Sequence, residues 1–173
     1  MARIRLIEFE EANKETKEIY EDIIKTRKEG LSNAFKAYAN NKHVLKANWE
    51  KHKTLLYSET SLPYKLKESI QLVVAKVMGC QGWINFHTKA LRGAGSNEDE
   101  IENILDTNVN TPLEKAVLDY VWKSSIDPKS LNDGDFMKLK EVGLSDEQIV
   151  EMQEVIGIGL SFSTFAESLI YPA

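Results

Sequence analysis

Apolar residues recur at intervals of three and four positions along most of the chain, which is the spacing of amphipathic α-helices. In the stretch from Glu10 to Arg27, for example, Tyr20, Ile23 and Ile24 share one face, and Gly30 is expected to end this helix. The same pattern predicts helices over residues 33–39, 44–57, 61–78, 80–92, 96–105, 111–124 and from 145 onward. No hairpin with alternating apolar residues is present. The sequence therefore predicts an all-α bundle of about seven to nine helices.

The helix predicted over residues 61–78 differs from the others, because its apolar residues lie nearly all the way round. Pro63 is expected in its first turn, where proline is favoured. A helix that is apolar on all sides is buried, so this segment is predicted to be the central helix of the bundle.

Two segments of the chain repeat each other at an offset of about 48 residues. Residues 91–101 and 139–149 both have Leu, a base, two residues, Gly, one residue, a small polar cap, two acids, one residue and Ile. Pro63 and Pro112 open equivalent helices in the two copies. The pattern predicts a duplicated helical unit whose two copies pack on each other, with a first repeat over about 61–105 and a second over about 111–170. The alternative is coincidence, because a glycine followed by a capped helix is common in helical proteins.

Length, charge and composition exclude several classes of protein. The chain has 173 residues, with 22 Lys and Arg against 27 Asp and Glu, and this length predicts one domain over residues 1–173 with an N-terminal helical arm over about 1–32. The net charge of −5 argues against nucleic-acid binding. No apolar run approaches the roughly 20 residues that span a bilayer, and the N-terminal residues lack the features of a signal peptide. We therefore expect a cytoplasmic protein that binds neither nucleic acid nor membrane.

The segment from Gly79 to His87 contains the candidate chemistry. Gly79 is expected to end the central helix, which places Cys80 in the first turn of the next helix, where the helix dipole favours a thiolate. His87 is two turns further along, about 10 Å from Cys80 along the axis, so a direct bond between thiol and imidazole is not expected. A turn at Gly79 folds the two helices into a hairpin and brings Glu68 opposite His87. A carboxylate, an imidazole and a thiol in this order can form a proton relay.

An interpretation without chemistry accounts for the same residues. A buried cysteine, a histidine that packs between helices and a solvated glutamate would have the same spacing. Trp83 is four residues before His87 and is expected to contact it. Trp49 is a second aromatic candidate for a pocket, although a place in the core or in a subunit interface is the more common role.

Three motifs have a joint spacing that is characteristic of one family: Pro63-x-Lys65-x-x-Glu68, then Gly79-Cys80 with six residues before His87, then Leu91-x-x-Ala94-Gly95 with an acid-rich helix cap. With this spacing the chain resembles the carboxymuconolactone decarboxylase and alkyl hydroperoxidase D superfamily, closest to its peroxidase-related branch. The resemblance covers residues 35–105 well and the second repeat more loosely. It implies an all-helical, alkyl hydroperoxidase D-like fold, often assembled as trimers or larger rings, with no cofactor and no metal.

In that family the motif is Cys-x-x-Cys-x-x-x-His, in which the second cysteine attacks the hydroperoxide, the first resolves the disulfide, and a glutamate and the histidine move protons. Carried over by position, the resemblance implies that Glu68, Cys80 and His87 are catalytic, and that Trp83 stands where the attacking cysteine belongs. Because Cys80 is the only cysteine, a dithiol cycle within one chain is impossible. Cys80 can still be oxidised to a sulfenic acid and reduced by an external thiol. Trp83 would add an apolar wall that suits an organic ligand.

Three functions remain open on the sequence. The first is a peroxidase-related antioxidant protein that reduces organic hydroperoxides through the single thiol of Cys80. The second is a non-redox, decarboxylase-like enzyme in which His87 or Glu68 performs acid–base chemistry on a small organic acid. The third is a helical binding or assembly module without catalysis. Cys80 favours the first function over the second, whereas the absence of a thiol at position 83 weakens it.

Assembly is predicted from apolar residues. The segments 44–57 and 157–170 have more of them than a single domain of this size should need to expose. We therefore expect a homo-oligomer, by resemblance a dimer, trimer or hexamer.

Overall fold

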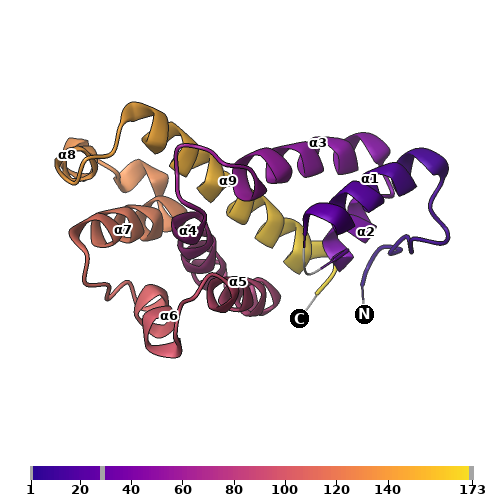
Figure 1. Ribbon diagram of the computed structural model, residues 1–173, viewed down its shortest axis with the longest axis horizontal. Helices are drawn as coiled ribbons and strands as arrows, with labels where there is room; N and C mark the ends of the chain where they lie inside the picture. Colours follow the sequence, from indigo (N-terminus) through magenta and orange to yellow (C-terminus); the bar gives the residue numbers. More distant parts are fainter. Residues whose placement is uncertain (1, 28–29, 172–173) are drawn as a thin grey trace. The chain divides into compact units, whose positions relative to one another are not determined.

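The chain is all-helical in a computed structural model that describes residues 2–27 and 30–171. In these ranges there are nine α-helices and no strand (Figure 1). The predicted fold class is therefore confirmed. The chain separates into two compact units, one formed by the residues up to Ser58 together with those from Thr164 onward, the other by Glu59–Ser163. Whether they form the single domain that the length predicts stays a prediction.

The first unit contains three helices before the C-terminal part of the last one: α1 (Lys14–Thr26), α2 (Asn33–Tyr38) and α3 (Lys42–His52), which continues as a π-helical turn, η1 (Lys53–Tyr57). Helix α1 is shorter than the predicted helix over residues 10–27. Its first turn is set by Asn13, whose side chain accepts a hydrogen bond from the backbone N–H of Thr16. Its C-cap is Arg27 and not Gly30. Likewise the side chain of Asn41 caps α3, which begins two residues before the predicted start.

The second unit contains the remaining helices: α4 (Tyr64–Val77), α5 (Gln81–Gly93), α6 (Glu98–Leu105), α7 (Pro112–Ile126), α8 (Asp133–Glu141) and most of α9 (Asp146–Leu169). Helix α4 packs against α5, α6 and α7, and ten of its fourteen residues are buried. It is the central helix that its pattern predicts.

Helix α9 approaches α4 closely through one glycine. A Cβ atom at Gly159 would lie 2.8 Å from Val74 Cγ1 and 2.9 Å from Gln71 Oε1, whereas a Cβ atom at Gly157 would meet nothing within 4 Å. Glycine is therefore needed at position 159, where no side chain fits between the two helices.

Helix α8 and the short 3-10 turn η2 (Pro128–Ser130) are not indicated by the apolar pattern. Helix α8 begins at a capping box, in which Asn132 and Asp135 bond each other's backbone N–H groups. Only Leu139 of this helix is buried, so its apolar face is too narrow to produce a clear helical period.

The two repeated segments have the same local conformation. Gly95 and Gly143, at matching positions, have φ angles of 91° and 92°. The residue after each glycine donates a 3.0 Å backbone hydrogen bond to a leucine carbonyl, Leu91 in one copy and Leu139 in the other. These are matching Schellman helix ends. Duplication of the whole unit stays a prediction.

No helix among the residues that the structure describes is both long enough and apolar enough to span a membrane.

Candidate active site

The turn between α4 and α5 is fixed by a helix-ending motif. Gly79 has a φ of 65°, its N–H donates to the carbonyl of Lys76, and the N–H of Cys80 donates to the carbonyl of Ala75, each at 3.0 Å. These two bonds define a Schellman motif, which needs a residue in the left-handed conformation where glycine is unstrained. The motif ends α4 and turns the chain back, so that α4 and α5 form the hairpin that the sequence predicts.

Cys80 is the N-cap of α5 and not a residue of its first turn, one position from the prediction. Its carbonyl accepts hydrogen bonds from the N–H groups of Trp83 and Ile84 at 3.0 and 2.9 Å. Its side chain is buried at the N-terminus of the helix.

Glu68 of α4 and His87 of α5 meet across the hairpin. Oε2 of Glu68 lies 2.7 Å from Nδ1 of His87, and each side chain is only 1% exposed. When the Glu68 carboxylate is ionised it can only accept a hydrogen bond; Nδ1 is then the donor, and a neutral imidazole has its lone pair at Nε2. The pair is a buried carboxylate–imidazole dyad with its basic atom directed away from the carboxylate.

Trp83 is part of an aromatic cluster beside this dyad. Its ring stacks on Phe162 of α9 with a centroid distance of 4.0 Å and on Phe86 with 4.9 Å. It also contacts the His87 ring edge to face, at 4.6 Å and an angle of 89°. The contact between positions 83 and 87 is thus the one that the helical spacing predicts. Trp83 and Phe162 are buried, whereas Phe86 is partly exposed.

Two polar atoms at this place have no protein partner. Among the described residues, neither Nε2 of His87 nor Nε1 of Trp83 makes a hydrogen bond, although both atoms are buried. A buried polar group without a partner costs about 1–3 kcal/mol. The site therefore has two polar atoms without a protein partner, on residues four positions apart on one helix.

A second cluster of buried polar side chains is centred on Lys67, the residue before Glu68. No sequence motif predicts this cluster. Nζ of Lys67 donates to Thr60 Oγ1 at 2.9 Å and lies 3.9 Å from Oε1 of Glu151. The Glu151 carboxylate also accepts hydrogen bonds from the hydroxyl of Thr60 and from the N–H and hydroxyl of Ser61. These bonds attach the segment before α4 to α9.

Burial and neighbouring charges have opposite effects on the pKa values of Lys67 and Glu151. Burial lowers the pKa of Lys67, against the opposing effect of the Glu151 and Glu68 carboxylates. Burial alone would raise the pKa of Glu151. Hydrogen bonds from Ser61 and Thr60, together with the charge of Lys67, outweigh it, so the pKa of Glu151 is below its ordinary value.

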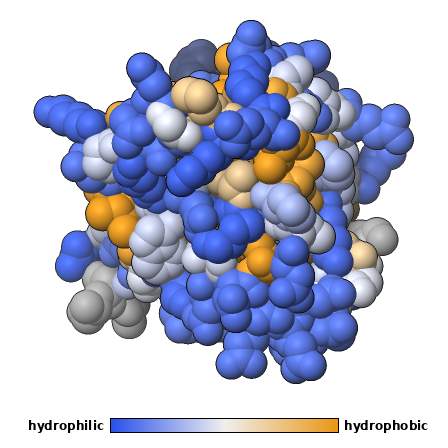
Figure 2. Space-filling model, turned by 90° about the vertical axis from the view of Figure 1, so that its left-hand side faces the viewer, coloured by the Kyte–Doolittle hydropathy of each residue, from blue (hydrophilic) through white to orange (hydrophobic). Residues whose placement is uncertain are grey.

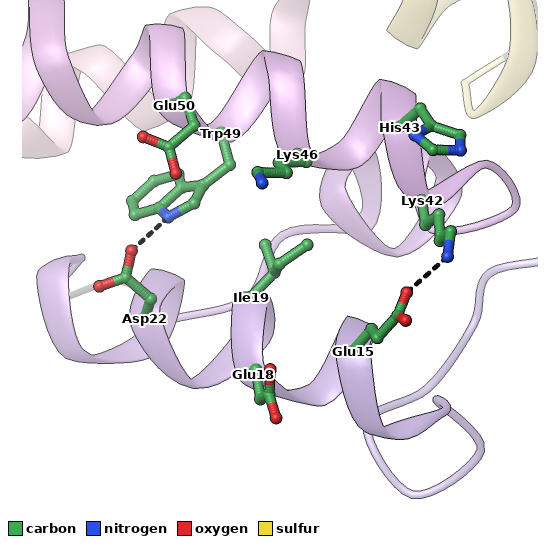
Figure 3. Close-up of a pocket in the computed structure, with 9 residues that line it drawn as sticks. All are labelled: Glu15, Glu18, Ile19, Asp22, Lys42, His43, Lys46, Trp49 and Glu50. Atoms are coloured by element: carbon green, nitrogen blue, oxygen red, sulfur yellow. Dashed lines mark hydrogen bonds and ion pairs between the residues drawn. The ribbon is translucent and has the colours of Figure 1, made fainter.

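Trp49, the other predicted pocket residue, belongs to the first unit. Its indole N–H donates to Asp22 at 2.6 Å and its ring contacts Phe35 edge to face. It lines a cleft of about 470 Å³ between α1 and α3, which the Glu15–Lys42 ion pair also lines (Figure 3). Trp49 and Trp83 thus have separate sets of neighbours.

The described part of the chain has no group of three or more His, Cys, Asp or Glu side chains that could hold a metal ion.

Part of the sequence matches a known family, and the fold is shared with several solved structures. Residues 44–123 match the carboxymuconolactone decarboxylase family. No curated protein matches the sequence.

Three solved structures share the fold at low sequence identity. A peroxidase-related protein from Silicibacter sp. TM1040 is 20% identical, with a TM-score of 0.83 over 97% of this chain and 89% of that one. A peroxidase-related protein with an alkylhydroperoxidase AhpD core from Ralstonia eutropha JMP134 is 18% identical, with a TM-score of 0.85 over 99% and 91%. The debrominase Bmp8, in complex with 2,3,4-tribromopyrrole, is 15% identical, with a TM-score of 0.78 over 90% and 83%.

The family match includes α4 and α5, the hairpin that brings Glu68 and His87 together, and the shared fold extends over nearly the whole chain. Residues 44–123 therefore resemble the carboxymuconolactone decarboxylase family, and the chain has the alkyl hydroperoxidase D-like fold that the sequence predicts.

Proposed function

We propose that this protein reduces organic hydroperoxides with Cys80 as its only thiol. The observation that carries the proposal is the buried Glu68–His87 dyad, whose Nε2 atom has no protein partner, on the same helix that Cys80 caps. A buried carboxylate orients an imidazole and supports its gain of a proton, which makes the ring an efficient proton carrier. The peroxidase-related proteins that share the fold support the same class of reaction.

The proposed reaction has two steps. The Cys80 thiolate attacks the terminal oxygen of the hydroperoxide, the O–O bond breaks, and the leaving alkoxide takes a proton to become an alcohol. The sulfur is thereby oxidised to a sulfenic acid. Two molecules of an external thiol then reduce it, which gives their disulfide, one water and the regenerated Cys80.

The dyad would handle the protons of the first step. Nε2 of His87 takes the proton that leaves the Cys80 thiol and returns it to the alkoxide. Cys80 and His87 are seven residues apart, about 10 Å along the helix axis, so the proton crosses through the substrate or a water molecule. Glu68 acts as a positioning residue that holds the imidazole and stabilises its charged form.

The substrate class follows from the walls of the site. The rings of Trp83, Phe86 and Phe162 supply an apolar, aromatic surface beside the dyad. Such a surface favours an organic group over hydrogen peroxide, because burial of apolar area drives its binding. A protein of this fold binds 2,3,4-tribromopyrrole, which is an aromatic organic ligand.

The test is a hydroperoxide-consumption assay with dithiothreitol as external reductant. We expect the wild-type protein to consume cumene hydroperoxide faster than hydrogen peroxide, and Cys80→Ser to be inactive with both. A Cys80→Ser protein as active as the wild type would refute the role of the thiol.

A second candidate function rests on the distance between Cys80 and His87. Because the dyad lies two turns from the thiol, it can act alone as a general base on a small organic acid, as in a decarboxylase-like enzyme. Such an activity would survive Cys80→Ser and disappear in His87→Ala. Hydroperoxide reduction, by contrast, would be lost in Cys80→Ser.

A further inference from the structure

We infer that the indole N–H of Trp83 and Nε2 of His87 together bind the oxygen atoms of the substrate. The ligand class is an apolar organic hydroperoxide or the alcohol formed from it. This inference deepens the proposed function, and it changes the role of Trp83 from an obstacle at the position of a lost thiol to a substrate-orienting residue.

The first support is the complementary hydrogen-bonding capacity of the two groups. The indole N–H is a donor only, and Nε2 of a neutral His87 with its proton on Nδ1 is an acceptor. Both are buried, and no described protein group pairs with either. A hydroxyl or hydroperoxide group both donates and accepts, so it satisfies both atoms at once. A carboxylate, which only accepts, would leave the neutral imidazole without a donor.

The second support is the position of Trp83 on α5. It is three residues after Cys80 and four before His87, so it occupies the helical turn between the thiol and the imidazole. A peroxide group held at Trp83 has the thiolate on one side and the dyad on the other. The peroxide group is then within reach of the thiolate, which attacks its terminal oxygen, and of the dyad, which moves a proton to the leaving oxygen.

The third support is the apolar surface that continues from the same residue. The stack runs from Phe162 and Trp83, both buried, to Phe86, which is partly exposed. The organic part of a ligand with its oxygen at the indole N–H therefore meets aromatic rings. We expect phenyl-substituted ligands to bind better than small aliphatic ones.

The first experiment measures binding without turnover. The chain has three tryptophans, Trp49, Trp83 and Trp122, so a protein labelled with ¹⁵N gives three indole N–H signals, of which Trp83→Phe identifies one. Cumyl alcohol, which contains a hydroxyl on a phenyl-substituted carbon and cannot be reduced, is the probe. We expect the Trp83 signal to move downfield in a saturable way while the Trp122 signal stays in place. A Trp83 signal that does not respond to cumyl alcohol would overturn the inference.

The second experiment measures the contribution of the N–H group to turnover. Trp83→Phe keeps an aromatic ring and removes the donor, and Trp122→Phe makes the same change on α7. We expect Trp83→Phe to raise KM for cumene hydroperoxide about tenfold, the effect of one lost hydrogen bond, and Trp122→Phe to leave it unchanged. The reaction rate of Cys80 with iodoacetamide should be the same in both variants, which shows that the thiol itself is intact.

The two readouts separate this inference from the proposed function. If cumyl alcohol shifts the Trp83 signal but no hydroperoxide is consumed, the binding site stands and the proposed reaction is wrong. If hydroperoxide is consumed, but the Trp83 signal does not respond and Trp83→Phe keeps the wild-type KM, the reaction stands and Trp83 only packs the hairpin.

Discussion

Glu68 fixes the orientation of the His87 imidazole ring. Its carboxylate is 2.7 Å from Nδ1 and both side chains are buried, so no water replaces it easily. We expect Glu68→Gln to lower kcat for hydroperoxide reduction by about 10²-fold, within the usual contribution of acid–base catalysis, because the neutral amide does not stabilise a charged imidazole. Steady-state kinetics measure this effect.

Glu102→Gln is the matched control, since Glu102 is an exposed carboxylate on α6 with no part in the site. Its activity should equal that of the wild type. Equal activity of Glu68→Gln and Glu102→Gln would show that the dyad has no role in catalysis.

At the scale of residues, the sequence was sufficient to predict Glu68 as the partner of His87 but not the aromatic rings beside the pair. The spacing of Glu68, Gly79 and His87 determines that a hairpin at the glycine brings the carboxylate to the imidazole. The stacking of Phe162 on Trp83 joins residues 79 positions apart, and no local pattern indicates it. The lack of a partner for the indole N–H is equally a property of the packed structure.

At the scale of elements, the contact between α4 and α9 depends on Gly159. A methyl group there would lie 2.8 Å from Val74 Cγ1, so Gly159→Ala should lower the free energy of unfolding by about 1–3 kcal/mol. Gly157→Ala, two residues earlier on the same helix, meets open space and should raise it by about 0.5–1 kcal/mol, because alanine favours a helix over glycine. Urea denaturation of both variants checks the opposite signs, and equal effects would contradict the close approach.

The cluster around Glu151 predicts a dependence of stability on pH. The folded-state pKa of Glu151 is below its ordinary value of 4.5, so its carboxylate stabilises the fold above that pH. This contribution is lost as the pH falls through the lower, folded-state pKa. Glu151→Gln should therefore be less stable than the wild type by about 1–3 kcal/mol at pH 7.

The same measurement at low pH provides the check. The difference between the wild type and Glu151→Gln should shrink as the pH falls below 4.5, while the difference for Glu102→Gln should stay near zero throughout. A difference for Glu151→Gln that is constant from pH 7 to pH 3 would mean that the negative charge of Glu151 does not stabilise the protein.

The elements themselves were predictable wherever an apolar stripe or a capping residue is present. Helices α4, α6 and α7 follow their patterns closely, and α6 and α7 begin at side-chain N-caps, Asn97 and Thr111. Helix α8 was missed because a single buried leucine gives no period. The helix predicted from Glu10 begins only at Lys14, because the side chain of Asn13 caps its first turn.

At the scale of the whole molecule, much of the apolar surface that motivated the assembly prediction is used inside the chain. Ile158, Phe162, Ala166 and Ile170 are buried. Where α7 and α8 lie, hydrophobic residues form small patches among hydrophilic ones (Figure 2). Exposed apolar residues of this part include Ile126, Phe136, Met137 and Val150.

Self-association stays a prediction, and these exposed residues of α7, α8 and α9 allow it to be tested. We expect light scattering at micromolar concentration to give a mass that is a multiple of the 19.7 kDa chain, and Met137→Lys to reduce it if α8 lies in the interface. A monomer mass for the wild-type protein would refute the prediction.

In the proposed reaction, Cys80 takes an oxygen atom from an organic hydroperoxide with help from the Glu68–His87 dyad. This reaction is tested most directly by mixing the reduced protein with one equivalent of cumene hydroperoxide in the presence of dimedone, which traps sulfenic acids, and measuring the intact mass over time. We predict a dimedone adduct on Cys80 in the wild type, much slower formation in Glu68→Gln and none in Cys80→Ser. A wild-type protein whose Cys80 stays unmodified while the hydroperoxide persists would contradict the account.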